Sequence, residues 1–233
     1  MNRRFLLRQL LQGLGATVGR QSFLWMAPFT PEDLTGLWRP AALPENVPAC
    51  AFAPIDHCAA GAAGLSAVDL LLHLFLLTYL PDDILTKTDR AAMFNSLEVR
   101  APFLDRRFAE FAWALPTSLK LRGRTRKYIL KQLALRYLPA GIVNRKKHGF
   151  AVPIGALIRT LFRERCCDVL LSRANPVADW FERDALDRLL NEHLAGSHDH
   201  GKKLWALYIL FAVAARRPTR SPFTYTPAVA TAR

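Results

Sequence analysis

Residues 96–105 have the sequence SLEVRAPFLD, in which Glu98 and Arg100 stand two residues apart among apolar neighbours, just before a proline turn. A charged group among apolar side chains is stable when it is paired or reaches water, so one interpretation is an ion-pair network at the edge of a core. The other is that the acid and the guanidinium act on a bound molecule. These ten residues leave both interpretations open.

The sequence around this segment resembles a known family. Residues 79–105 are YLPDDILTKTDRAAMFNSLEVRAPFLD and residues 144–153 are NRKKHGFAVP. Their order is a leucine-proline-acidic start, a lysine-x-aspartate-arginine step, the SLEVR segment and a lysine-containing glycine-phenylalanine turn. This order resembles the synthetase domain of glutamine-dependent asparagine synthetases. The resemblance covers residues 1–215 and is most specific from residue 79 to the HGKKLWALYIL stretch at 200–210.

Two parts of that family's architecture do not appear in this chain. Members begin with a nucleophilic cysteine of a glutaminase domain, whereas residue 2 is Asn2 here. They also carry a serine-glycine-glycine-x-aspartate-serine loop for the pyrophosphate of ATP, but no two glycines of this chain are adjacent. The resemblance therefore implies a mainly α chain, the helical carboxy-terminal portion of an α/β adenine-nucleotide alpha-hydrolase-like (PP-loop ATP pyrophosphatase) synthetase domain. We expect an incomplete chain, with a partial synthetase domain over 1–215 and a disordered tail over 216–233.

The resemblance also implies a two-step reaction with ATP and magnesium as substrates of the complete enzyme, and we expect this chain alone to bind neither of them tightly. A carboxylate such as that of aspartate is adenylated, and ammonia derived from glutamine then forms the amide. Lys147 is expected to be the cation that stabilises charge on phosphate, and Glu98 the base that takes a proton from nitrogen. Arg100 is expected to position a carboxylate or keep Glu98 ionised, and Lys127 to lie near phosphate, so both are assigned to nucleotide or substrate binding.

Each of these assignments has a simpler alternative. A run of charges such as the one around Lys147 is usually a solvated face. The simpler role for Lys127 is an ion pair with an acid at helical spacing. The family commonly has proline before the site lysine, whereas this chain has Lys146, so either lysine could face the site. No metal ligands are assigned. Asp82 and Asp83 fit a turn and helix start, and the six histidines and four cysteines have no ligand spacing.

Composition limits the remaining possibilities. The chain has 233 residues, 51% of them apolar, which is enough for one sizeable core. Its formal net charge of +13 fits an anionic partner, but the basic runs lack interleaved aromatic residues, so we expect no nucleic acid. The apolar run at 70–80 is shorter than the ~20 residues that span a bilayer. We expect a buried core helix there, no membrane contact and, with few cysteines, a cytoplasmic location.

Helix signals occur along most of the chain. Thr30, Ser66 and Asp105 are predicted to cap helices, and further helices are expected after Pro153 and at the carboxy-terminal end. Residues 39–64, rich in proline, alanine and glycine, are predicted to be a loop or linker. Apolar side chains at helical spacing are predicted to face a core: Leu6, Leu7, Leu10, Leu11, Leu14, Phe108, Phe111, Ala112, Leu130, Leu133, Ala134, Tyr137, Leu138, Ala185, Leu186, Leu189 and Leu190.

The function expected from these observations is that of an ATP-dependent amidoligase, a ligase of the asparagine synthetase type. An amino-terminal half could exist as a separate chain and partner. One alternative is a related adenylating cyclase, of the β-lactam synthetase or lasso-peptide cyclase type. The other is a non-catalytic basic helical binding module.

Overall fold

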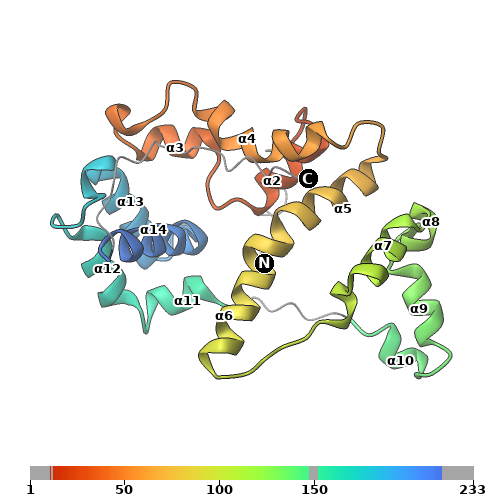
Figure 1. The fold of residues 1–233 in the computed structure, drawn as a ribbon. Helices are drawn as coiled ribbons and strands as arrows, with labels where there is room; N and C mark the ends of the chain where they lie inside the picture. The colour runs from red at the N-terminus through yellow and green to blue at the C-terminus, as the bar shows by residue number, and fades with distance from the viewer. Residues whose placement is uncertain (1–10, 12, 147–151, 217–233) are drawn as a thin grey trace. The chain divides into compact units, whose positions relative to one another are not determined.

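The computed structural model describes residue 11 and residues 13–146 and 152–216. This part of the chain is mostly helical, as the sequence predicts (Figure 1). Its only strands, β1 and β2, are two residues long and antiparallel, with Leu121 opposite Arg126. None of the helices described is long and apolar enough to cross a membrane. The predicted helix over residues 6–14 and the predicted tail lie largely outside the described residues, but Leu11 and Leu14 are described and are exposed, so these two do not face the predicted core.

The chain divides into two compact units. Unit 1 comprises residues 1–15, 20–54 and 151–233, and unit 2 comprises residues 16–19 and 55–150. Among the described residues, the elements that lie wholly in unit 1 are five α-helices and two 3-10 helices: α3 (Pro31–Leu37), η1 (Pro40–Ala42), α11 (Ile154–Arg159), α12 (Arg163–Leu171), η4 (Ala178–Trp180), α13 (Arg183–Leu194) and α14 (Gly201–Ala214). Those of unit 2 are α5 (Ala67–Leu77), η2 (Leu80–Leu85), α6 (Thr86–Phe94), η3 (Pro102–Leu104), α7 (Arg106–Ala114), α8 (Thr117–Lys120), β1 (Leu121–Arg122), β2 (Thr125–Arg126), α9 (Tyr128–Ala134) and α10 (Ala140–Val143). Two further helices have residues in both units: α2 (Val18–Met26) and α4 (Val47–Ala60).

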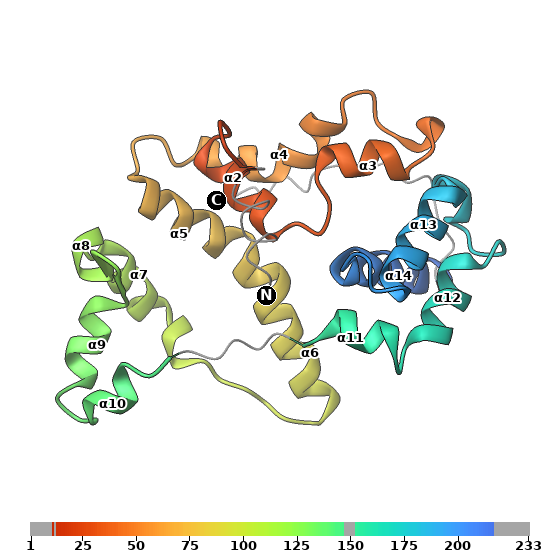
Figure 2. The same cartoon turned by 180° about the vertical axis from the view of Figure 1, so that it is seen from behind.

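The core of unit 1 forms around α14, which lies beside α11, α12 and α13 (Figure 2). Leu204, Leu207 and Phe211 recur at spacings of three and four residues, so they share one face of the helix, and all three are buried. The sequence from Leu204 to Phe211 is apolar nearly all round, a pattern that predicts a buried helix. Instead, Trp205 and Ile209 on other faces remain exposed, so α14 is buried along one stripe only.

A second contact in unit 1 joins α3 to the carboxy-terminal helices. Thr30 caps α3 in a capping box with Asp33, as predicted. The Lys203 ammonium on α14 lies 2.6 Å from the Asp33 carboxylate. Burial tends to raise the pKa of Asp33, but the hydrogen bond from Lys203 and those from Thr30 lower it overall. At the end of α3, an antiparallel bridge pairs Trp38 with Phe181.

In unit 2 a polar cluster around Asp69 connects α5, α7 and α8. Ser66 caps α5, as predicted, and its hydroxyl and that of Thr117 both donate to the Asp69 carboxylate. The Lys120 ammonium lies 3.3 Å from Asp69 and donates to the Trp113 carbonyl. The hydrogen bond from Thr117, followed by that from Ser66, lowers the pKa of Asp69. From the sequence, only the Ser66 cap of this cluster was predicted, and the contacts of Thr117 and Lys120 with Asp69 were not.

Residues 39–64 are not the predicted loop, because most of the segment forms α4 and a short 3-10 turn. Its alanines favour a helix, and the helix tolerates Pro54 in its interior. Phe52 and Ile55, three residues apart, are both buried, which supplies the packing that the composition did not reveal. The prediction failed because tertiary contacts outweigh the cost of one proline.

Several predicted core stripes are exposed in unit 2. Leu76 and Leu77 of the apolar run at 70–80 are about half exposed, while Leu74 is buried. Asp105 caps α7 as predicted, but Phe108 and Phe111 are exposed, and so are Leu130, Leu133, Tyr137 and Leu138. The spacing identified α7 and the start of α9, but α9 ends at Ala134, before Tyr137 and Leu138, and the spacing did not determine what covers either helix.

Candidate functional site

An open groove lies in unit 2 along the segment that carries the family resemblance. Its volume is about 1380 Å³. The walls are formed by η2, α6, the chain that follows α6, and η3. The lining residues are Pro81, Leu85, Thr86, Thr88, Asp89, Ala92, Met93, Ser96, Leu97, Glu98, Val99, Arg100, Ala101, Pro102, Leu104 and Asp105.

The backbone that forms the groove departs from a regular helix at two points. Residues Leu80–Leu85 form a π-helix that runs directly into α6. At the other end of α6, the Ser96 amide donates to the Met93 carbonyl and the Leu97 amide to the Ala92 carbonyl. This is the Schellman pattern, and Ser96 takes the left-handed conformation, with φ of 57°, that glycine usually supplies. The helix therefore ends abruptly, and the following residues run along the groove.

Glu98 and Arg100 are brought together in this groove. The Arg100 guanidinium forms an ion pair with the Glu98 carboxylate, and their side chains are 88% and 69% exposed, respectively. The two side chains form an ion pair, as the simpler interpretation of the sequence expects. The pair does not lie at the edge of a core, however, because both side chains are largely exposed. Both groups are therefore accessible to a bound molecule.

The remaining predicted site residues lie elsewhere or outside the description. Lys127 precedes α9 and does not line the groove. It has φ of 56° and is, with Ser96, one of two non-glycine residues with positive φ in the part of the chain described. Lys147 lies outside the described residues, and Lys146 is exposed. The structure thus brings Glu98 and Arg100 together in the groove.

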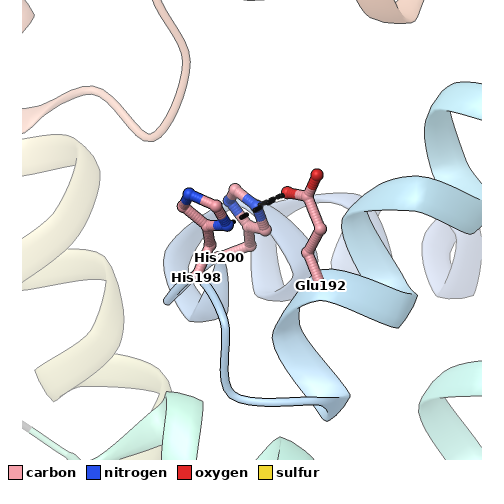
Figure 3. Close-up of side chains that lie close together, drawn as sticks. All are labelled: Glu192, His198 and His200. Carbon is pink, nitrogen blue, oxygen red and sulfur yellow. Dashed lines mark hydrogen bonds and ion pairs between the residues drawn. The ribbon is translucent and has the colours of Figure 1, made fainter.

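Two groups of residues were not assigned to a functional site from the sequence. Asp89 and Asp105 also line the groove, so the lining holds three carboxylates and one guanidinium. In unit 1, Glu192, His198 and His200 converge, although the histidines showed no ligand spacing in the sequence (Figure 3). In the sequence, a glutamate followed six and eight residues later by histidine was the only indication of this cluster. The spacing brings the three side chains together only if the chain reverses between them.

Comparison with known proteins places the chain in a family. The asparagine synthase family profile matches residues 3–216. A Mycobacterium bovis protein, provisionally named a glutamine-hydrolyzing asparagine synthetase, is 38% identical over 152 residues, which are 64% of this chain and 23% of the relative. Glutamine-hydrolyzing asparagine synthetase 1 of Bacillus subtilis is 32% identical over 144 residues, 62% of this chain and 22% of the relative. The Gallus gallus asparagine synthetase is 31% identical over 98 residues, 38% and 18% of the two chains.

The chain therefore spans less than a quarter of the length of these relatives. No solved structure matches it significantly. The family profile nevertheless covers all of the residues that the structure describes. The chain belongs to the asparagine synthase family.

Proposed function

We propose that this chain supplies one wall of the active site of an ATP-dependent amidoligase of the asparagine synthetase type. The observation that carries the proposal is the Glu98–Arg100 pair, which stands exposed in an open groove formed by the family-like segment. In the proposed reaction the carboxylate of aspartate attacks the α-phosphorus of ATP, which forms an acyl-adenylate and releases pyrophosphate. Ammonia then attacks the acyl carbon and expels AMP.

Glu98 suits the second step. Ammonia gains a positive charge as it bonds to carbon, so a carboxylate within reach can take its proton. Arg100 beside it offers a planar fork of N–H donors to a second carboxylate, that of the substrate. Together the two residues would remove the proton and orient the acyl group.

The first step needs a net positive charge beside the phosphates, which the groove lining does not supply. With three carboxylates and one guanidinium, its lining repels phosphate oxygens. We propose Lys147 as the main cation, with Lys127 as a second one near phosphate. The left-handed backbone at Lys127 is consistent with a functional constraint, because such strain clusters at functional sites.

ATP binding also needs a cradle of backbone amides. We propose that a glycine-rich phosphate loop and the acids that hold magnesium come from another segment of the synthetase domain, in the manner of the PP-loop superfamily. The apolar residues exposed in the groove, among them Met93, Leu97 and Val99, suit a wall that such a segment covers. An acidic partner surface would fit the net charge of +13 on this chain.

The experiment is complementation. The 233-residue chain is mixed with the part of the Bacillus subtilis relative that precedes the matched region, produced separately, and supplied with ATP, magnesium, aspartate and ammonium. We expect asparagine and pyrophosphate to form in the mixture and from neither chain alone, with a complex that weakens as salt rises. ATP bound at micromolar affinity by the 233-residue chain alone would contradict the proposal that the phosphate loop lies elsewhere.

The same mixture identifies the lysine. Lys147→Ala should lower pyrophosphate formation about a hundredfold, since it removes the cation at the site of developing charge. Lys146→Ala is the matched control, one residue away in the same basic run, and should change the rate little. The reverse result would show that the turn is shifted by one residue. If both variants form pyrophosphate at the wild-type rate, neither lysine belongs to the proposed site.

A further inference from the structure

Three potential metal-ligating side chains converge where α13 turns into α14, well apart in sequence from the groove. His200 Nε2 lies 2.6 Å and His198 Nδ1 lies 3.7 Å from the same oxygen, Glu192 Oε2 (Figure 3). The two imidazole rings are nearly parallel, with an angle of 16° between their planes. One ligand atom from each of the three residues lies within 4.8 Å of the others.

The loop that carries the two histidines is folded back onto α13. Gly196, with φ of 74°, reverses the chain at the end of the helix. The Glu192 carbonyl then accepts a hydrogen bond from the Ser197 hydroxyl and another from the His198 amide. At the next helix, the Gly201 amide donates to the Asp199 carboxylate. The positions of both histidines are therefore set by backbone contacts and do not depend on the imidazole–carboxylate contacts alone.

A buried histidine supports the loop from below. His193 is fully buried, and its Nδ1 accepts the His200 amide at 3.1 Å. Its Nε2 lies 2.9 Å from the Gly155 carbonyl on α11 and donates to it. Since both ring nitrogens are used in the neutral form, His193 is a structural residue and is not one of the three potential metal ligands.

The spacing of the donors suits a metal ion. Donor atoms about 2.05 Å from a tetrahedral zinc ion are about 3.3 Å apart. The two distances to Glu192 Oε2, 2.6 and 3.7 Å, lie on either side of that value, and all three ligand atoms lie within 4.8 Å of one another, so modest side-chain rotations would bring the three donors around one ion. A simple ion pair between His200 and Glu192 would leave unexplained why a second imidazole faces the same oxygen.

We propose that Glu192, His198 and His200 form a binding site for a borderline divalent transition-metal ion such as zinc. Two imidazoles and one carboxylate favour zinc, cobalt, nickel or copper over magnesium and calcium, which prefer oxygen ligands. Three protein donors leave a fourth position open to water or to a further ligand. The site is independent of the proposed amidoligase function, since it lies in unit 1 and shares no residue with the groove.

The test is cobalt and zinc titration of the tag-free 233-residue chain at neutral pH. We expect one cobalt ion per chain with the strong visible absorption of tetrahedral coordination, displaced by one equivalent of zinc and unaffected by millimolar magnesium. His198→Ala should weaken zinc binding tenfold or more, and so should Glu192→Gln, which keeps the shape and hydrogen bonding of the side chain. His198 is 63% exposed, so its replacement should leave the fold intact, as circular dichroism would check.

The control is His57→Ala, which removes an exposed histidine of unit 2 and should leave zinc affinity unchanged. Equal zinc affinity in wild type and His198→Ala, or a sulfur-to-cobalt charge-transfer band that assigns the ion to cysteine, would overturn the proposal. Absence of zinc binding tighter than about 100 µM would overturn it too, because a site with three ordered ligands should exceed that affinity.

Discussion

Replacing Gly201 by alanine should destabilise unit 1, although alanine is the better helix former. Gly201 is the first residue of α14 and meets Gly155, which lies on α11. A Cβ atom at Gly201 would lie 2.6 Å from the Gly155 Cα and 2.9 Å from its nitrogen. Both are backbone atoms, so the clash is relieved only if one helix moves.

The expected magnitude follows from two opposing effects. Alanine gains at most about 1 kcal/mol over glycine inside a helix, and less at its first residue. Overpacking against a fixed backbone costs about 1–3 kcal/mol. The displacement of α11 would also disturb the hydrogen bond between the Gly155 carbonyl and the buried His193. The free energy of unfolding should therefore fall by about 1–2 kcal/mol.

Urea unfolding followed by tryptophan fluorescence measures this change, since Trp38, Trp180 and Trp205 all lie in unit 1. Gly36→Ala is the matched control, because Gly36 lies within α3 in the same unit with no heavy atom within 4 Å of an added Cβ. It should stabilise the chain by up to about 1 kcal/mol. A Gly201→Ala protein as stable as Gly36→Ala would refute the close contact of α11 and α14.

Two more predictions concern buried or partly buried ionisable side chains. Asp69→Asn removes the countercharge of Lys120, whose side chain is 17% exposed, and should lower the free energy of unfolding by about 1–3 kcal/mol. Urea unfolding with circular dichroism detection measures this change. A loss below about 0.5 kcal/mol would mean that the pair contributes no more than a surface ion pair. Burial lowers the pKa of His193 below its ordinary value, so the unfolded chain takes up its proton more readily. The contribution of His193 to stability is therefore complete above about pH 6.5 and is lost as pH falls through the lower folded-state pKa, which urea midpoints measured from pH 7 to 5 should show; a midpoint that does not fall in this interval would contradict the neutral, buried assignment.

Local signals in the sequence predicted local structure well. The caps at Thr30, Ser66 and Asp105 are all present, because a side chain that accepts an amide hydrogen bond three residues on needs no other part of the chain. α13 was predicted from its apolar spacing, and the end helix from a nearly continuous apolar run. The mainly helical character of the described residues follows from the same signals.

Features that depend on distant contacts could not be predicted. α4 was missed because Phe52 and Ile55 become buried only in the folded chain. Phe108 and Phe111 were assigned to a core that does not cover them. Glu98 and Arg100 could be selected only through the family resemblance, since their pairing is local but the groove around them is not. The cluster at Glu192 depends on the chain reversal at Gly196, which spacing alone does not reveal.

The central claim, that the groove is a catalytic surface, is tested most directly by Glu98→Gln in the complemented enzyme. Two rates are compared, ATP–pyrophosphate exchange dependent on aspartate and formation of asparagine from ammonium. Glutamine keeps the shape of the side chain but cannot take a proton, so amide formation should fall about a hundredfold or more while exchange largely persists. Glu110→Gln is the control, since Glu110 is exposed and paired with Arg106 at 2.8 Å on α7, outside the groove.

Selective loss of amide formation in Glu98→Gln, with Glu110→Gln unchanged, is the result that this account predicts. Equal loss of both rates would show that Glu98 acts in binding or folding instead. If Glu98→Gln formed asparagine as fast as the wild type, the groove would not be the site of amide formation.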